Sequence, residues 1–198
     1  MTGNKYKTSR DESEGEILPN KLGLKTKDQL EKAELEGFIY AYKVLFDKLS
    51  PRTKFDLKYI LKMHKLALNH LYAFAGKTRT VNMSKGGFMF PPALALDNAL
   101  KEFNETVLTN LPKSYESEEL LIQCIARVHA ELLFIHPFRE GNGRTARLLA
   151  NLMAAKAGHK LLDLENFSKE KFDEYVKAVK LAANRDYSLM EKIIRSLF

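Results

Sequence analysis

A histidine, a carboxylate, three arginines and a Gly-Asn-Gly turn lie together in the segment 136–147, which reads His-Pro-Phe-Arg-Glu-Gly-Asn-Gly-Arg-Thr-Ala-Arg. Proline disfavours the α conformation in the residue before it, so a preceding helix should end at His136 and present the imidazole at its terminus. A helix that begins at Asn142 or Gly143 would offer unpaired N–H groups to an anion. These residue types predict a phosphate site with a base beside it.

Two arginines would supply fixed positive charge to this site. Arg144 and Arg147 are three residues apart, which places them on one face of a helix, and guanidinium groups bind phosphate oxygens in a defined geometry. Gly141 and Gly143 allow a phosphate to approach the backbone closely. Glu140 offers oxygen ligands to a hard divalent cation. The segment is therefore predicted to hold a polyphosphate.

Other interpretations of the same segment explain less. Residues 141–146 fit the relaxed dinucleotide pattern G-x-G-x-x-A, with Asp163 about twenty residues further on, but that pattern needs a strand before it, and the preceding segment has helical periodicity. A G-x-x-x-x-G-K-[ST] loop is absent from the sequence. A purely structural turn accounts for the glycines and leaves Glu140, Arg144 and Arg147 unexplained.

Apolar periodicity predicts helices over most of the chain. Thr26 and Gln29 form a capping-box pattern that opens a helix ending at Ser50-Pro51. The segment 117–135 is apolar nearly all round, so its helix belongs at the centre of the fold. Further helices are expected at 54–71, 93–108, 145–157 (entered at Asn142–Gly143), 168–183 and 188–197.

The segment 76–92 differs from the rest, because two threonines and a valine at 78–81 favour a strand, 84–87 reads as a turn, and 88–90 can return as a second strand. The fold class is therefore predicted to be all-α with one short β-hairpin, or flap. A short edge strand can pair with an extended segment of another protein through main-chain hydrogen bonds.

Length and composition favour one domain. The chain has 198 residues, of which 45% are hydrophobic, enough for one well-filled core. Residues 1–16 are expected to form a flexible tail, followed by a single domain at 17–198 with its core at about 54–190. The N-terminus lacks the apolar run of a secretory signal and no segment is long enough to span a membrane, so a cytoplasmic protein is expected. Cys124 is predicted to be a buried structural thiol.

The formal net charge is +7, but the lysines are scattered and interleaved with acidic residues. This pattern favours an acidic partner over specific binding of nucleic acid. The histidines outside the segment 136–147 have no metal-ligand spacing, and we expect them to be structural or on the surface. They are His64, His70, His129 and His159.

The segment 136–147 matches H-x-F-x-[DE]-G-N-G-R-x-x-R, the signature of Fic proteins, at every defined position, and 79–87 resembles the flap upstream of that signature. The resemblance extends from about Leu18 to the C-terminus. It implies a Fic-type helical bundle with one short β-hairpin flap. It also implies a protein adenylyltransferase, which transfers AMP from ATP to a Tyr, Thr or Ser hydroxyl of a target protein and releases pyrophosphate.

The resemblance also implies a role for each residue of the motif. His136 would be the general base, and the ordinary pKa of histidine, about 6.5, suits that task. Glu140 would hold Mg²⁺ between the α- and β-phosphates, and Phe138 would anchor the loop in the core. The ATP phosphates would be bound by an anion hole, to which Asn142 adds a side-chain donor, and by an arginine clamp: Gly141, Asn142, Gly143, Arg144 and Arg147.

The flap would dock the target protein beside the base. The docking residues implied are Ser84, Lys85, Gly86, Gly87 and Phe88. Phe88 either clamps the target side chain or packs within the hairpin, and the sequence leaves both open.

Fic enzymes are commonly inhibited by a glutamate from a helix with the pattern [ST]-x-x-x-E-[GN], which pairs with the second motif arginine, here Arg147. The sequence holds no complete copy, because Glu36-Gly37 has Lys32 at the Ser/Thr position and Glu191 also lacks the flanking residues. We therefore expect a small separate antitoxin to supply the glutamate, and 20–23 is similar to that subclass. Inhibition by Glu36 or Glu191 is the alternative.

Three other functions compete with adenylyl transfer. A Fic-like kinase or phosphocholine transferase would be expected to alter the anion loop, which is intact here. An inactive nucleotide-binding interaction module would be expected to have lost His136 or Glu140. A nucleic-acid binder would show binding that weakens steeply with salt.

Overall fold

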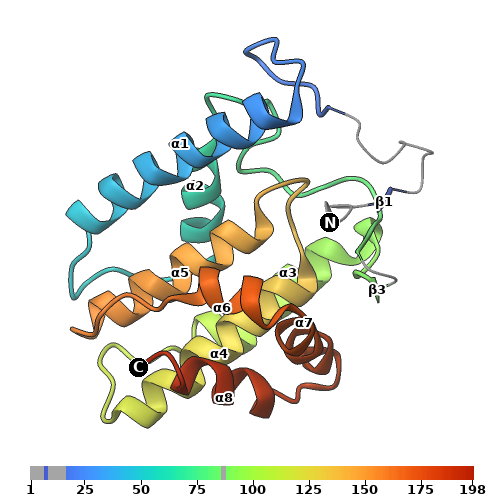
Figure 1. The fold of residues 1–198 in the computed structure, drawn as a ribbon. Coiled ribbons are helices and arrows are strands. Elements are labelled where there is room, and N and C mark those ends of the chain that lie inside the picture. Colours follow the sequence, from blue (N-terminus) through green and yellow to red (C-terminus); the bar gives the residue numbers. More distant parts are fainter. Residues whose placement is uncertain (1–6, 9–16, 86–87) are drawn as a thin grey trace.

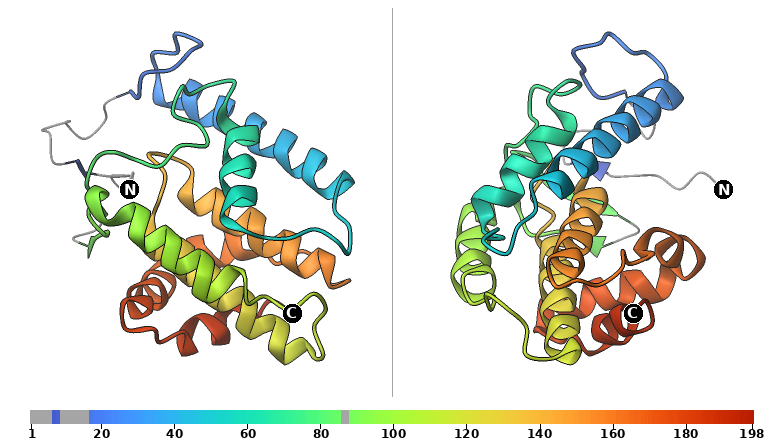
Figure 2. Two further views of the ribbon diagram at one scale, coloured as in Figure 1. Left: turned by 180° about the vertical axis from the view of Figure 1, so that it is seen from behind. Right: turned by 90° about the vertical axis from the view of Figure 1, so that its left-hand side faces the viewer.

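The computed structural model describes residues 7–8, 17–85 and 88–198 (Figure 1). Helices α4 and α5 form the centre of the described fold. The α1–α2 pair packs on one side of them, and α7 and α8 pack on the other (Figures 1 and 2). The predicted all-α fold with a short hairpin is confirmed. The helices named here are α1 (Lys27–Asp47), α2 (Leu57–Leu68), α4 (Glu118–Ile135), α5 (Asn142–Lys156), α7 (Phe172–Leu181) and α8 (Ser188–Arg195).

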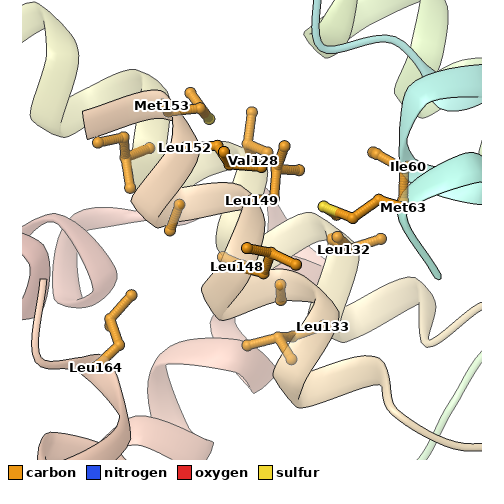
Figure 3. Close-up of a cluster of buried hydrophobic side chains, with 14 of the residues drawn as sticks. Ile60, Met63, Val128, Leu132, Leu133, Leu148, Leu149, Leu152, Met153 and Leu164 are labelled. Carbon is orange, nitrogen blue, oxygen red and sulfur yellow. The ribbon is translucent and has the colours of Figure 1, made fainter. Parts of the chain in front are cut away.

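The contact between α4 and α5 forms the middle of the hydrophobic core. Ser117 caps α4 by accepting a hydrogen bond from Leu120 N at 3.2 Å, and most of the apolar side chains of α4 are buried, as predicted. Figure 3 shows this cluster between α4, α5 and α2. Its labelled members on these helices are Ile60, Met63, Val128, Leu132, Leu133, Leu148, Leu149, Leu152 and Met153.

Helix α1 begins at the predicted capping box: Thr26 Oγ1 accepts from Gln29 N and Gln29 Oε1 accepts from Thr26 N, each at 3.3 Å. It packs closely on α2 at Gly37, where a Cβ atom would lie 2.0 Å from the carbonyl oxygen of Ala67. Only glycine permits this approach. The close packing of α1 on α2 brings one face of α1 over the start of α5.

The predicted helix at 93–108 has three local forms. A 3₁₀ turn (Ala93–Ala95) leads into α3 (Leu96–Phe103), which continues as a π-helical turn (Asn104–Leu108). Within this turn, Asn104 Oδ1 accepts a hydrogen bond from Leu57 N at 3.0 Å. The turn therefore ties this segment to the first residue of α2.

The flap contains β2 (Met83–Lys85) and β3 (Phe88–Met89), which pair antiparallel with Lys85 opposite Phe88. A third strand, β1 (Lys7–Thr8), pairs antiparallel with the other edge of β2. Sequence analysis did not predict this strand. The rest of the predicted flexible tail at 1–16 lies outside the described residues, as do Gly86 and Gly87 of the predicted turn.

The C-terminal region differs from its prediction. One helix was expected to start at Ser168, but the structure has α6 (Leu164–Glu170) and then α7, with a break at Lys171. Asp163 is the N-cap of α6, since its carboxylate accepts from Asn166 N. Ser168 lies inside α6, where its hydroxyl donates to Glu165 O at 2.9 Å. The earlier cap therefore starts the helix one turn sooner.

Two further predictions concern the thiol and the membrane. Cys124 is half-buried rather than fully buried and packs against the core, and burial raises the pKa of its thiol. Within 7–8, 17–85 and 88–198, the structure has no helix of the length and apolarity needed to cross a membrane.

Candidate active site

His136 is the first residue after α4 and has φ 53° and ψ 57°, in the left-handed region. This conformation is uncommon for a residue other than glycine, and the following proline disfavours the ordinary helical one. The ring Nδ1 donates to Leu133 O at 3.1 Å, because a carbonyl oxygen can only accept. In the neutral ring the lone pair is therefore on Nε2, as a general base requires.

Helix α4 ends just before His136, as predicted, and the imidazole at its terminus is buried. Phe90, just after β3, stacks on the ring at 3.8 Å with an interplanar angle of 16°, and His136 is 5% exposed. Burial, opposed by the hydrogen bond to Leu133 and aided by the charges of Lys85 and Arg79, lowers the pKa of His136 to about 3. The ring is therefore neutral near pH 7.

Arg79 joins the flap to the histidine loop, a role that sequence analysis missed. Its side chain donates from Nε to His136 O at 2.7 Å, from Nη1 to Val81 O at 2.7 Å and from Nη2 to Pro91 O at 2.6 Å. Its backbone N donates to Pro137 O at 2.8 Å. Burial lowers the pKa of Arg79 to about 10, which still leaves it charged. This buried cation therefore joins both ends of the hairpin to the backbone carbonyl groups at His136 and Pro137.

Phe138 anchors the loop, as predicted. It is fully buried and stacks on His64 at 3.8 Å. His64 accepts at Nδ1 from Gly76 N at 2.8 Å, so Nε2 carries the proton that it donates to Glu140 O at 2.9 Å. Burial lowers the pKa of His64 to about 4. His64 thus has the structural role that was expected.

Helix α5 begins at Asn142, as predicted. Gly141 has φ 78°, and a Cβ atom there would lie 3.0 Å from Leu68 Cδ1, so the turn requires glycine. One expectation needs correction, because the Asn142 side chain accepts from Phe138 N at 2.8 Å and donates to Phe138 O at 2.7 Å. Its amide fixes the loop instead of extending toward a phosphate, which leaves the backbone N–H groups of α5 to attract an anion.

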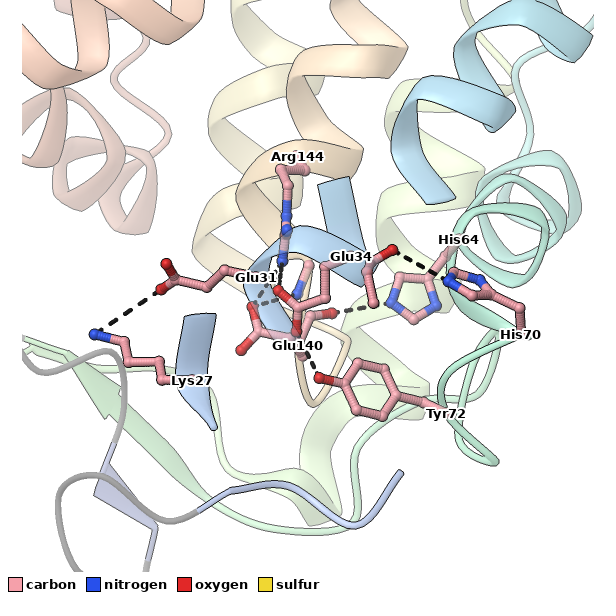
Figure 4. A network of polar contacts seen from close by, with 10 residues as sticks. Lys27, Glu31, Glu34, His64, His70, Tyr72, Glu140 and Arg144 are labelled. Atoms are coloured by element: carbon pink, nitrogen blue, oxygen red, sulfur yellow. Dashed lines mark hydrogen bonds and ion pairs between the residues drawn. The ribbon is translucent and has the colours of Figure 1, made fainter. Parts of the chain in front are cut away.

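Glu140 and Arg144 meet beside a carboxylate from α1 (Figure 4). Glu140 Oε1 accepts from Gly141 N at 2.9 Å and lies 3.4 Å from Arg144 Nη2. The same nitrogen is 2.5 Å from Glu34 Oε2, and the Tyr72 hydroxyl donates to Glu34 Oε1 at 2.5 Å. Sequence analysis missed Glu34, although a glutamate on the apolar stripe of α1 was a usable signal.

Glu140 is the one motif residue whose chemistry suits a metal ion directly. The described residues contain no group of three or more His, Cys, Asp or Glu that could hold a metal. Mg²⁺, however, is usually held by one or two carboxylates together with substrate phosphates and water. A buried carboxylate at the start of α5 fits that pattern.

Arg147 lies on the same face of α5, near helices α6 and α7. It lies close to Tyr175 on α7, a buried tyrosine: burial raises the pKa of Tyr175 to about 12, and Arg147 opposes that rise. The Tyr175 hydroxyl is 2.5 Å from His129 Nε2, and His129 Nδ1 is 3.2 Å from Ala146 O. The second motif arginine therefore has a buried support that the motif did not reveal.

The flap residues lie close to the histidine. Lys85 is near enough for its charge to lower the pKa of His136. Phe88 packs edge-on against Phe90 at 5.4 Å and lies 6.1 Å from Phe134. Of the two roles left open for Phe88, the structure shows the packing contact within the hairpin.

Glu36 and Glu191, the two glutamates considered for inhibition, lie elsewhere in the described structure. Glu36 is exposed in a groove of about 630 Å³ between α1 and α2, with Lys62 and His70. Glu191 is in α8, where the hydrogen bond from Arg195 to Glu119 and, to a smaller extent, the charge of Glu191 raise the pKa of Arg195. Besides Glu140 of the motif itself, Glu34 contacts a motif arginine, and that arginine is Arg144.

The fold and the site together define a class: a helical domain in which a buried histidine ends one central helix and an arginine-bearing anion turn begins the next. The sequence model of the Fic/DOC family matches residues 54–154, about half of the chain. The chain belongs to this family.

Curated relatives carry names that describe an activity. The chain is 30% identical over 158 residues to "Protein adenylyltransferase VbhT" of Bartonella schoenbuchensis, covering 78% of this chain and 33% of that protein. It is 30% identical over 144 residues to "Protein adenylyltransferase Fic" of Nematostella vectensis, covering 72% and 33%. The matched region is thus about a third of each of these relatives.

Solved structures share the fold. The N-terminal FIC domain of Bep8 from Bartonella sp. 1-1C gives a TM-score of 0.74 at 20% identity, over 96% of this chain and 93% of that one. BepC from Bartonella tribocorum, solved with bound AMPPNP, gives 0.71 at 22% identity, over 91% of each chain. The predicted Fic-type fold is confirmed.

Proposed function

We propose that this chain is a protein adenylyltransferase that transfers AMP from ATP to a Tyr, Thr or Ser hydroxyl of a target protein and releases pyrophosphate. The observation that carries this proposal is the neutral, buried imidazole of His136 next to the N-terminus of α5, with Glu140, Arg144 and Arg147 around it. The names of the curated relatives support the same reaction.

His136 acts as the general base in this reaction. Its Nε2 accepts the proton of the target hydroxyl, whose oxygen forms a bond to the α-phosphorus of ATP. The bond between that phosphorus and the oxygen bridging to the β-phosphate breaks, and pyrophosphate leaves. The position of the imidazole is set by Leu133, Phe90 and Arg79, so it is oriented before substrates bind.

The triphosphate binds at the start of α5. The backbone N–H groups of Asn142 and Gly143 face the phosphates, where the helix dipole favours negative charge. Gly141 completes the anion hole by forming the left-handed turn, and its own N–H donates to Glu140. Arg144 and Arg147 hold the β- and γ-phosphates and so orient the α-phosphorus for in-line attack. Glu140 would hold Mg²⁺, and the ion, when bound, would neutralise part of the charge of the phosphates.

The flap docks the target through the outer edge of β2. Support comes from β1, since Lys7–Thr8 of this same chain already pairs antiparallel with that edge, opposite Ser84 and Met83. Main-chain pairing makes little demand on the sequence of the target. The docking segment assigned here comprises Ser84, Lys85, Gly86, Gly87 and Phe88.

Control by a separate antitoxin belongs to the same proposal. The sequence holds no complete [ST]-x-x-x-E-[GN] pattern, and a net charge of +7 suits an acidic partner that delivers a glutamate to Arg147. This makes the chain the toxin of a toxin–antitoxin pair, acting in the cytoplasm on ATP and a target protein.

Labelling with radioactive ATP tests the proposed reaction. Incubation of the chain with α-labelled ATP and Mg²⁺ should label the chain itself or a protein of a bacterial lysate, whereas γ-labelled ATP should label neither. His136→Ala should reduce labelling by about 100-fold or more and retain ATP binding. The matched control is His159→Ala, which removes a partly exposed imidazole. Equal labelling by the His136 and His159 variants would remove the proposed base.

A further inference from the structure

A second buried carboxylate lies in the phosphate site and is assigned no role by the Fic motif. Glu34 on α1 is 3% exposed. One carboxylate oxygen accepts from the Tyr72 hydroxyl at 2.5 Å and the other from Arg144 Nη2 at 2.5 Å (Figure 4). Because a buried charge is costly without partners, these two donors fix the position of the Glu34 carboxylate.

Arg144 lies between two carboxylates and contacts both, one of them much more closely than the other. Its Nη2 is 2.5 Å from Glu34 and 3.4 Å from Glu140. A charge-assisted N–H···O bond is about 2.7–2.9 Å long, so the closer contact dominates. Phe38, one turn after Glu34 on α1, lies 5.0 Å from the Arg144 guanidinium. Helix α1 therefore holds the guanidinium from two adjacent turns.

We propose that Glu34 is a positioning residue that draws Arg144 toward α1, keeps its contact with Glu140 long and so leaves the Glu140 carboxylate available to the Mg²⁺ that accompanies ATP. The inference rests on the proposed function. Glu140 and Arg144 are four residues apart across the start of α5, a spacing at which side chains of opposite charge normally pair. Without the charge of Glu34, Arg144 would move to Glu140 and compete with the metal ion for its oxygens.

The test measures how strongly Mg²⁺ and ATP binding are coupled. ATP is titrated by calorimetry with and without Mg²⁺, and the ratio of the two dissociation constants for ATP is the coupling. All variants carry His136→Ala, so that ATP is not turned over during the titration. Glu34→Gln keeps the size of the side chain and removes its charge. We expect the coupling to fall about tenfold, within the range usual for linked ligands.

Two further variants make the result specific. Glu36→Gln removes a glutamate from α1 on the side that faces α2, and it should leave the coupling unchanged. Tyr72→Phe removes one donor to Glu34 and should lower the coupling in the same direction by a smaller factor. If Glu34→Gln does not fold, as judged by thermal unfolding, the Tyr72→Phe result decides, and unchanged coupling there overturns the inference.

The alternatives give different results. Equal weakening of ATP binding with and without Mg²⁺ would mean that Glu34 only supports the fold. Equal tightening would mean that Glu34 competes with the phosphates for Arg144. Either result overturns the inference and leaves the proposed function intact. Failure of the His136→Ala chain to bind ATP under any condition would overturn both.

Discussion

The orientation of Arg147 follows from one tautomer of a buried histidine. The carbonyl of Ala146 can only accept, so His129 Nδ1 carries the proton and Nε2 accepts from the Tyr175 hydroxyl. The lone pairs of the Tyr175 oxygen are then turned to the nearby Arg147, which opposes the rise in the pKa of Tyr175 that burial causes. Burial lowers the pKa of His129 to about 3, so the ring keeps this neutral form. A fully connected buried network of this kind fixes geometry as well as adding stability.

The substitution Tyr175→Phe should weaken ATP binding by about tenfold, since Arg147 loses the nearby hydroxyl oxygen toward which its charge is drawn. AMP lacks the β- and γ-phosphates that Arg144 and Arg147 are proposed to hold, so its affinity should change little. Calorimetry with both nucleotides measures the difference.

The matched control is Tyr187→Phe, which removes a hydroxyl that hydrogen-bonds Glu131 and should not discriminate between the nucleotides. A general loss of folding in the Tyr175 variant would weaken ATP and AMP alike, and that outcome would count against an orienting role.

At the scale of elements, the flap and the histidine loop behave as one unit. Arg79 bonds carbonyls at both ends of the hairpin and at His136, while Phe90 covers the imidazole. A segment that pairs with β2 therefore lies next to the hairpin that Arg79 joins to His136, the proposed base. In this structure the pairing segment is β1.

Deletion of residues 1–9 removes β1 and leaves the outer edge of β2 unpaired. We expect labelling of an added target protein to increase severalfold, because the target no longer competes with the chain's own strand for main-chain hydrogen bonds. Steady-state labelling at varied target concentration measures this as a lower KM for the target. The KM for ATP serves as the internal control and should not change. An unchanged KM for the target would show that β1 does not compete at this edge.

At the scale of the whole molecule, the fold buries three histidines in neutral form. Burial lowers the pKa of His64 to about 4 and those of His129 and His136 to about 3, against about 6.5 in an unfolded chain. Between these values the unfolded chain binds more protons, so the free energy of unfolding falls as the pH drops below about 6.5.

Each histidine should contribute about 1.4 kcal/mol of lost stability per pH unit within that window. Urea unfolding at pH 7, 6 and 5 measures the slope. His129→Gln should lower the slope by the contribution of one histidine, about 1.4 kcal/mol per pH unit. His159→Gln, at a partly exposed position, should leave the slope unchanged. A slope that is the same in the parent and the His129 variant would show that this imidazole is not buried in neutral form.

Local features were predictable because they depend on neighbours in the chain. The end of α4 at Ile135, the start of α5 at Asn142 and the anchor at Phe138 all follow from a short motif. The prediction was wrong where two local signals competed. The cap at Asp163 starts α6 before Ser168 can act as one, and the Asn142 amide bonds the loop backbone.

The sequence by itself determined the class of fold, the family and the residues of the motif, because each depends on spacing within one helix or turn. Tertiary structure alone decided what surrounds those residues. Glu34 contacts Arg144 across 110 positions, and Arg79 contacts His136 across 57. No local pattern encodes such contacts, since they arise only when helix packing brings distant side chains into one buried space, where each charge must find a partner.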